Sequence, residues 1–334
     1  MRLDGQPNPA SGREGHEMIS VTALGELLID FTDAGTSAGG QKLFERNAGG
    51  APANVLVALS RLGHKTAFMG KVGTDMHGQF LRSTLEADDV DCTGLVMDDE
   101  HFTTLAFVAL SPEGERSFSF ARKPGADTCL TTDELACDVI RESRVFHVGS
   151  LSLTDEPARS ATLAALGCAR EAGCVMSYDP NYRASLWTSP EAASEQMRSI
   201  LPYMDLIKIS AEECELVAGA ATPEEAAAAL LAGGAKVVVV TLDAEGAFVA
   251  CADGSRVVPS FHVDPVDTTG AGDSFWGGFL AAFCESGLTP TEVGIEQAAS
   301  FVRFGNAVAS LCVRGRGGIP SMPGRADVEA LLAE

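Results

Sequence analysis

The feature that most constrains the fold is a strict alternation of helical and extended patterns after Leu130. Apolar runs rich in β-branched residues predict strands at 144–148, 174–178, 206–209 and 237–241. Longer stretches with helical periodicity predict helices at 156–172, from Ser189 onward, and at 211–218 and 223–231. Alternating strands and helices build a parallel sheet covered on both faces. The sequence therefore predicts an α/β fold with a doubly wound, mainly parallel sheet, whose ligands bind at the carboxyl ends of the strands.

Polar side chains follow the predicted strands at these carboxyl ends. The clusters are Asp179 with Asn181 and Arg183, Lys208 with Glu213, and Thr241 with Asp243. Each cluster alone is typical of a helix cap or a solvated loop. Their recurrence at successive strand ends favours a binding site along this edge of the sheet.

A glycine-rich turn at residues 267–273 (DTTGAGD) precedes an apolar run at 275–283, which reads as a buried helix. Gly270 and Gly272 allow successive amides to point at one anion, and a helix amino terminus attracts negative charge. Asp273 would repel that anion unless it has another task, and accepting a proton from an attacking hydroxyl is such a task. The alternative is ordinary turn and capping chemistry.

The amino-terminal half has a different pattern. Residues 18–31 predict one strand, interrupted at Gly25 and ending near Asp30, whose carboxylate could accept hydrogen bonds from ligand hydroxyls. Residues 32–48 predict a loop with a short exposed strand, and the glycines of 49–54 (GGAPAN) precede a helix that ends near residue 62.

Two alternating stretches, 103–110 and 115–120, predict a hairpin around a Ser-Pro-Glu-Gly turn. Together with residues 32–46 they could form a small sheet outside the main domain. Arg116 and Phe118 are two residues apart and would share one face of it.

Several enzyme motifs are absent or incomplete. The G-x-S-x-G match at 35–39 has no apolar helix after it, as a hydrolase nucleophile elbow requires. Gly70 with Lys71 does not form a phosphate-binding P-loop, since no Ser or Thr follows the lysine. The first strand lacks the G-x-G-x-x-G that a dinucleotide-dependent dehydrogenase on the same fold class needs.

The chain has 334 residues and a net charge of −22, with a pI near 4.6. This charge argues against nucleic acid or an anionic membrane as a partner. No apolar run is long enough for a transmembrane helix, and residues 1–17 predict a disordered extension rather than a signal peptide. The expected folded domain is therefore 18–334.

Nine cysteines are present without a C-x-x-C pair, and most lie in apolar runs. This pattern predicts free thiols in a reducing, cytoplasmic setting, with no disulfide and no metal bound by cysteine.

The stretches at 49–54 and 267–273 resemble the amino- and carboxyl-terminal signatures of the ribokinase-like (PfkB) carbohydrate kinase family, and the resemblance extends over about 18–323. It implies an ATP-dependent kinase that phosphorylates a primary hydroxyl of a sugar. It also implies that about 31–47 and 101–122 form a small β-sheet lid over the sugar.

The resemblance implies a role for each matched residue. Asp273 would be the catalytic base, and Gly270, Ala271 and Gly272 would form an anion hole. The sugar ligands would be Asp30, Gly49, Gly50, Asn54, Arg116, Phe118 and Arg183. The nucleotide ligands would be Lys208, Thr241, Asp243, Gly246, Thr269, Gly272 and Asn306. Glu213 would order Mg²⁺ through water, and Asp267 with Thr269 would hold a monovalent cation, taken as K⁺. Three residues depart from the family pattern: Ser210 and Lys123 replace Asn, and Asp243 replaces Gly.

Residues 25–31, 115–120, 124–127 and 186–187 most resemble the fructokinase subgroup, which implies D-fructose as substrate and fructose 6-phosphate as product. A 2-keto-3-deoxygluconate kinase, or another sugar or nucleoside kinase of the family, is the alternative. A catalytically inactive sugar or nucleotide sensor is opposed by the intact Asp273 and its glycines.

The weak alternation at 103–110 leaves both faces of the lid apolar, which favours a homodimer whose lids pack together. The alternative is a lid that packs one face on the main domain and exposes the other.

Overall fold

The computed structural model describes the backbone of residues 18–110 and 116–334, and the side chains of 18–108 and 119–334. The extension expected at 1–17 lies outside these residues. The body is one nine-stranded sheet in the order β13-β12-β11-β10-β9-β8-β1-β4-β5. Its strands are β1 (Ile19–Leu24), β4 (Thr66–Gly73), β5 (Val90–Asp98), β8 (Ser143–Val148), β9 (Val175–Tyr178), β10 (Leu206–Ser210), β11 (Val237–Thr241), β12 (Ala247–Cys251) and β13 (Gly254–Val258). All neighbouring pairs are parallel except β11–β12 and β12–β13.

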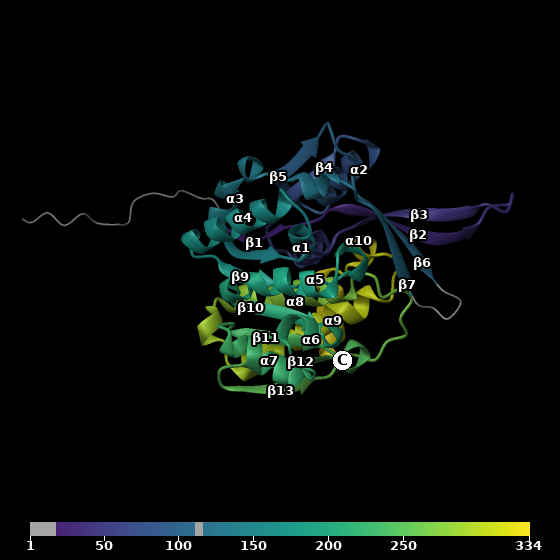
Figure 1. Ribbon diagram of the computed structural model, residues 1–334. Coiled ribbons are helices and arrows are strands. Elements are labelled where there is room, and N and C mark those ends of the chain that lie inside the picture. The colour runs from purple at the N-terminus through teal and green to yellow at the C-terminus, as the bar shows by residue number, and fades with distance from the viewer. Residues whose placement is uncertain (1–17, 111–115) are drawn as a thin grey trace, which may run out of the picture.

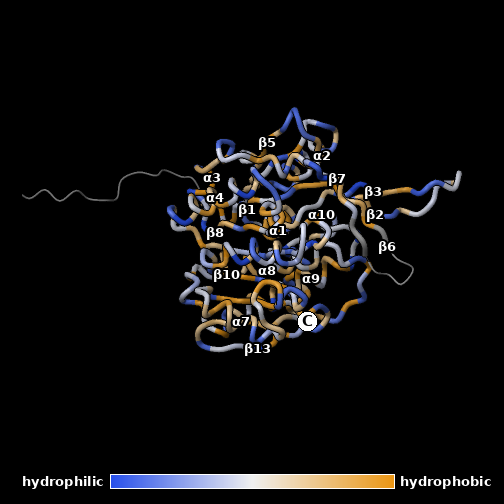
Figure 2. The backbone as a smooth tube through the Cα atoms, viewed as in Figure 1, coloured by the Kyte–Doolittle hydropathy of each residue, from blue (hydrophilic) through white to orange (hydrophobic). Residues whose placement is uncertain are grey.

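Helices cover both faces of this sheet (Figure 1), which confirms the predicted doubly wound architecture. The helices are α1 (Ala51–Arg61), α2 (Met76–Ala87), α3 (Cys137–Arg141), α4 (Ala158–Ala172), α5 (Pro190–Ser199), α6 (Cys214–Ala218), α7 (Pro223–Ala232), α8 (Ala271–Ser286), α9 (Ile295–Cys312), α10 (Gly318–Ser321) and α11 (Arg325–Ala333). Figure 2 shows hydrophobic stretches concentrated inside the body and hydrophilic turns around it.

Two hydrophobic cores lie on the two faces of the sheet. In β11, Val237 and Val239 pack into the core that contains α1, α8 and α9, whereas Val238 and Val240 pack into the core that contains α4, α5 and α7. Successive side chains of a strand point to opposite faces, so a strand buried on both sides needs a continuous apolar run. This is why the runs after residue 130 predicted these strands well.

A second, four-stranded sheet projects from one side of the body (Figure 1). Its order is β3-β2-β6-β7, and its strands are β2 (Leu28–Thr36), β3 (Lys42–Gly49), β6 (Leu105–Leu110) and β7 (Arg116–Ala121). β2 and β6 are parallel, and the other two pairs are antiparallel. The small second sheet and its β6–β7 hairpin are therefore confirmed.

The interruption predicted at Gly25 is confirmed, but the two parts of 18–31 belong to two strands in different sheets rather than to one. The chain leaves the main sheet at Gly25 and enters the second sheet as β2. A Cβ at Gly25 would lie 2.5 Å from the ring of Pro52, so the break lies where the chain passes close to the start of α1. Within 32–48, the expected short exposed strand is confirmed as β3, which begins at Lys42, but the expected loop is confined to 37–41 because β2 continues to Thr36.

The length of the loop was overestimated because of exposure. The outer parts of β2 and β3 are solvent-exposed, so their sequence has only weak apolar alternation. The G-x-S-x-G match at 35–39 spans the turn between these strands, and no helix follows it, which rules out a nucleophile elbow there. Strands β5, β12 and β13 were not predicted; β13 is almost entirely exposed.

No helix within the described ranges is both long and apolar enough to cross a bilayer. All nine cysteines are free thiols. Over the same ranges, no three His, Cys, Asp or Glu side chains gather as metal ligands would.

Helices α1 and α8 pack closely at Gly277. A Cβ at this position would lie 2.7 Å from the Cβ of Ala58 and 3.0 Å from the carbonyl oxygen of Val55. Neither atom belongs to a flexible side chain, so only glycine permits this approach. The same pair of helices carries the polar side chains discussed below.

We expect Gly277→Ala to destabilise the protein by about 1–3 kcal/mol, because the added methyl group overpacks the contact. Gly167→Ala, in α4, is the matched control: a Cβ there meets no atom within 4 Å, so the gain in helix propensity should stabilise by up to about 1 kcal/mol. Urea denaturation of both variants measures the difference, and equal effects would contradict the packing argument.

Candidate active site

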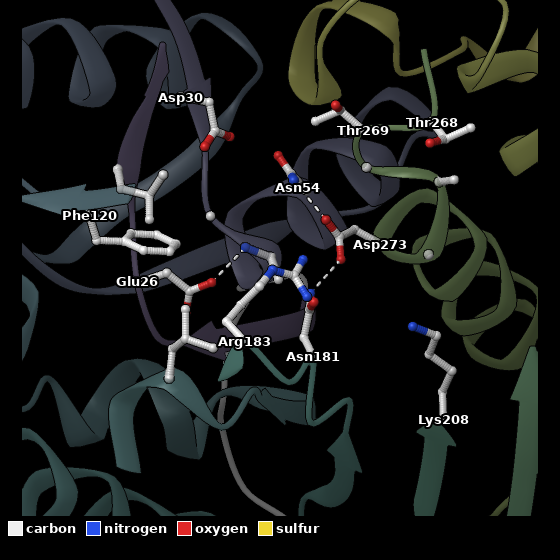
Figure 3. Close-up of a pocket in the computed structure, with 17 residues that line it drawn as sticks. Glu26, Asp30, Asn54, Phe120, Asn181, Arg183, Lys208, Thr268, Thr269 and Asp273 are labelled. Carbon is white, nitrogen blue, oxygen red and sulfur yellow. Dashed lines mark hydrogen bonds between the residues drawn. The ribbon is translucent and has the colours of Figure 1, made fainter. Parts of the chain in front are cut away.

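A pocket lies between the second sheet and the carboxyl ends of the main strands (Figure 3), as the topology requires. It is lined by residues from both halves of the chain: Glu26, Leu28, Asp30, Gly50, Ala51, Asn54, Phe120, Leu151, Asn181, Arg183, Lys208 and the segment 268–273. The fold therefore gathers most of the predicted sugar-side and catalytic residues in one place.

The carboxylate of Asp273 is held by two amide side chains (Figure 3). The Nδ2 group of Asn54 donates to Oδ2 at 2.7 Å, and the Nδ2 group of Asn181 donates to Oδ1 at 3.0 Å. Asp273 is buried, and burial raises its pKa, while the two amides and the charge of Lys208 oppose that rise. The site thus contains a carboxylate oriented from both sides, as a general base requires.

The amino terminus of α8 is suited to bind an anion. Gly270 is its N-cap, with φ +76°, and no side chain caps the first turn. The Ala271 amide donates to the Thr268 carbonyl oxygen at 3.2 Å, whereas the amides of Gly272 and Asp273 have no partner inside the helix. Those two amides are available to a phosphoryl group, which the positive end of the helix also attracts.

Lys208 brings a positive charge to this turn. A Cβ at Gly272 would lie 2.9 Å from Lys208 Nζ, so glycine permits the close approach. Nζ donates to Asp179 Oδ2 at 2.7 Å. Burial disfavours the charged amine, but the carboxylates of Asp179 and Glu213 outweigh this and raise the pKa of Lys208 above its usual value. Lys208 is therefore a cation at neutral pH.

On the opposite side, Asp30 is held close to the start of α1. A Cβ at Gly49 would lie 2.1 Å from Asp30 Oδ2, and Gly50 has φ +117° with its Cβ position 2.3 Å from the Glu26 carbonyl oxygen. Both glycines are needed for this geometry. The Oδ1 atom of Asn54 is buried and has no partner among the described residues.

Two of the predicted sugar ligands are not placed by the structure. The side chains of Arg116 and Phe118 lie outside the described part of the chain. Arg183 lines the pocket, as the sequence predicted.

Four of the predicted nucleotide residues do not line this pocket but lie together beyond it: Thr241, Asp243, Gly246 and Asn306. Asn306 Nδ2 donates to the carbonyl oxygens of Val258 and Pro259, at 3.2 and 3.1 Å. A Cβ at Gly246, where φ is +108°, would lie 2.1 Å from the same Val258 oxygen. Thr241 ends β11, and Asp243 follows with φ +51°.

The predicted metal residues are already bonded to backbone amides. Glu213 accepts from the amides of Tyr182 and Ser210 at 2.7 and 2.8 Å. Asp267 accepts from the amide and hydroxyl of Thr269 at 3.0 and 2.8 Å, and from the amide of Gly317 at 2.9 Å. These bonds order the loops, and any metal contact would add to them.

Sequence reasoning gave no role to six further residues that line the pocket, namely Glu26, Leu28, Ala51, Phe120, Leu151 and Thr268. The sequence position of Glu26 could have indicated a functional residue, because it directly follows the strand interruption at Gly25, where the chain passes from one sheet to the other. Asn181 was noted only as part of a polar cluster, and its contact with Asp273 joins segments 92 residues apart.

A family model for pfkB family carbohydrate kinases matches residues 18–325. The chain belongs to this family of sugar kinases. Among its relatives is probable fructokinase-2 of Arabidopsis thaliana, which is 44% identical over 314 residues, covering 93% of this chain and 94% of the relative.

Solved structures of similar kinases share the fold. A fructokinase from Xylella fastidiosa with bound ATP has a TM-score of 0.87 at 33% identity, covering 94% of this chain and 98% of its own. A fructokinase from Vibrio cholerae O395, bound to fructose, ADP and calcium ion, has a TM-score of 0.85 at 34% identity, covering 94% and 99%. The pfkB kinase described here thus has the ribokinase-like fold that its sequence predicted.

We expect Asn181→Gly to move the acid limb of the kcat/KM profile to higher pH. The lost donor leaves ionised Asp273 less stabilised, so its pKa rises, and a base works only when ionised. Glycine suits the φ of +50° at this position. The pH dependence of sugar phosphorylation measures the shift.

Asp89→Gly is the control, because Asp89 has a similar φ of +55° in a turn outside the pocket. An acid limb that stays in place in Asn181→Gly would show that Asn181 does not tune the base.

Proposed function

We propose that the protein is an ATP-dependent fructokinase, which transfers the γ-phosphate of ATP to the primary 6-hydroxyl of D-fructose. The observation that carries the proposal is the buried Asp273 carboxylate, oriented by Asn54 and Asn181 at the uncapped amino terminus of α8. The fructokinase names of relatives at 44% identity and of structural neighbours at 33–34% support the choice of sugar.

In this reaction, Asp273 accepts the proton of the 6-hydroxyl as its oxygen bonds to the γ-phosphorus. The bond between the γ-phosphorus and the β,γ-bridging oxygen breaks, and ADP leaves. Amides of residues 270–273 donate hydrogen bonds to the transferring phosphoryl group, and Lys208 adds a positive charge beside it. Because these donors are held by the fold, they need no reorganisation during transfer.

The sugar lies between the second sheet and α1. Asp30, Gly50 and Asn54 contact its hydroxyls, with Gly49 keeping Asp30 in place and Arg183 closing one side. The unpartnered Oδ1 of Asn54 fits a hydroxyl donor. Arg116 and Phe118, in β7, are proposed as further sugar ligands from the family resemblance alone.

ATP extends from the α8 turn toward the loop after β11. Its ligands are Lys208, Thr241, Asp243, Gly246, Thr269, Gly272 and Asn306. Glu213 would hold Mg²⁺ through water, and the ion would neutralise phosphate charge; Asp267 and Thr269 would hold K⁺. The proximity of Gly246 and Asn306 at Val258 supports one continuous nucleotide surface.

We further propose that residues 18–334 act as one cytoplasmic kinase domain, with a lid formed by about 31–47 and 101–122. Nine free thiols support a reducing compartment. The lid carries a ring cluster of Phe31, Phe44 and Phe107, in which Phe44 is 47% and Phe107 38% exposed. Covering these rings favours a homodimer through the lid.

A coupled ADP-release assay with a panel of sugars tests the substrate. We expect D-fructose to give the highest kcat/KM, and Asp273→Asn to lower kcat with it by at least about 10²-fold, because the general base is lost. The KM for ATP should change little, since Asp273 contacts the hydroxyl rather than the nucleotide.

The outcomes separate the alternatives. A preference for 2-keto-3-deoxygluconate or a nucleoside would reject fructose while keeping the kinase, and turnover of Asp273→Asn within a few-fold of wild type would reject the base. Asp33→Asn is the control, because Asp33 is a second-sheet carboxylate that bonds Lys42.

Light scattering at micromolar concentration tests the assembly. We expect a mass near twice the 34.8 kDa of one chain, and Phe107→Lys should reduce it to one chain by placing a charge on the covered face. Val257→Lys is the control, because Val257 is 53% exposed at the far edge of the main sheet. A wild-type mass near one chain would reject the dimer.

A further inference from the structure

Glu26 is a buried carboxylate in the wall of the active-site pocket that the proposed mechanism does not use. It lies in the short link between β1 and β2, where the chain passes from the main sheet to the second sheet. Its side chain lines the pocket beside Asp30 and Phe120 (Figure 3), although the residue is only 3% exposed. A buried carboxylate needs partners for both oxygens, so each oxygen is considered in turn.

One oxygen has a structural task. Oε1 accepts a hydrogen bond from the amide of Ala51 at 2.8 Å, at the first turn of α1. That helix end has no other side-chain cap, and a carboxylate there is stabilised by the helix dipole. Since α1 also carries Asn54, this bond helps to hold the amide that orients Asp273.

The other oxygen, Oε2, is buried and has no hydrogen-bond partner among the described residues. The guanidinium of Arg122 donates instead to Asp127, Thr154 and the Leu151 carbonyl oxygen. Burial raises the pKa of Glu26 to about 7. Leaving such an acceptor unpaired is costly, which indicates that a ligand supplies the missing donor.

We propose that Glu26 is a sugar-binding residue, whose Oε2 atom accepts a hydrogen bond from a hydroxyl of the bound sugar other than the one that is phosphorylated. This inference rests on the proposed function. Oε1 holds the start of α1 through the Ala51 amide, while Oε2 binds the sugar hydroxyl. One side chain thus connects sugar binding to the helix whose Asn54 orients Asp273. Asp273 and Lys208 lie across the pocket (Figure 3), which leaves the reacting hydroxyl to them.

The variant Glu26→Gln separates the two tasks. The glutamine carbonyl oxygen still accepts from the Ala51 amide, whereas the NH₂ group that replaces Oε2 cannot accept from a hydroxyl. We expect D-fructose to bind about tenfold or more weakly in calorimetry without ATP, since the buried acceptor for one sugar hydroxyl is lost. The KM for ATP should stay within about twofold, because the sugar contact alone is changed. A purely structural Glu26 would leave fructose affinity unchanged, which would overturn the proposal.

Monodeoxy analogues of fructose identify the hydroxyl. The analogue that lacks this hydroxyl should bind to the wild type about tenfold or more weakly than fructose does. To Glu26→Gln, the analogue and fructose should bind equally, because the variant and the analogue each remove the same hydrogen bond. Independent losses for every analogue would overturn the proposal. Glu134→Gln is the matched control, because Glu134 accepts the Thr131 amide at 2.8 Å outside the pocket. It should bind every analogue as the wild type does.

A crystal structure of the wild type with D-fructose needs no variant. We expect a sugar oxygen within about 3.2 Å of Oε2, and a separation beyond hydrogen-bond reach would overturn the proposal even if Glu26→Gln failed to fold. The failure of the proposed function is distinguishable: the sugar panel would then show no phosphorylation of fructose by the wild type, whatever Glu26 does.

Discussion

The hydrogen bonds to Asp273 are the interaction on which the rest of the site depends. Its two donors come from α1 and from the loop after β9, so the carboxylate, our proposed base, is oriented only when both halves of the chain are folded against α8. Close packing at Gly277 keeps α1 and α8 together, and the left-handed φ of Asn181 aims its amide at the carboxylate. The scaffold thus serves to hold one carboxylate in one orientation, which general-base catalysis requires.

Electrostatics explain how an acidic chain can bind phosphate. The net charge of −22 is spread over the molecule, whereas the α8 turn presents amide donors and the buried Lys208. Local donors outweigh distant charges, because exposed charges are screened beyond about 10 Å at moderate salt. Carboxylates instead line the sugar side of the pocket at Asp30 and Glu26, where hydroxyl groups can donate to them.

Most strands that are buried on both faces were predicted from the sequence, whereas exposed strands were predicted poorly. The valines of β11 are apolar because both faces of that strand are covered, so the sequence predicted its position. The outer residues of β2 and β3 are exposed, and only a short strand within a loop was predicted there, although both strands belong to the second sheet. The inner part of β2 pairs with β6, more than 60 residues away in the chain, and local patterns contain no information on such partners.

By itself, the sequence determined the alternating sheet and the glycine turn before α8, because these depend on local periodicity and on glycine's freedom at positive φ, and it led to the proposal of Asp273 as base. Only the tertiary structure decided which donors reach Asp273, that Gly25 separates two sheets, and that Glu26 enters the pocket with one oxygen unpartnered among the described residues. The physical reason is that hydrogen bonds between side chains depend on distance and direction in space, and chain segments far apart in sequence acquire these only when the fold brings them together.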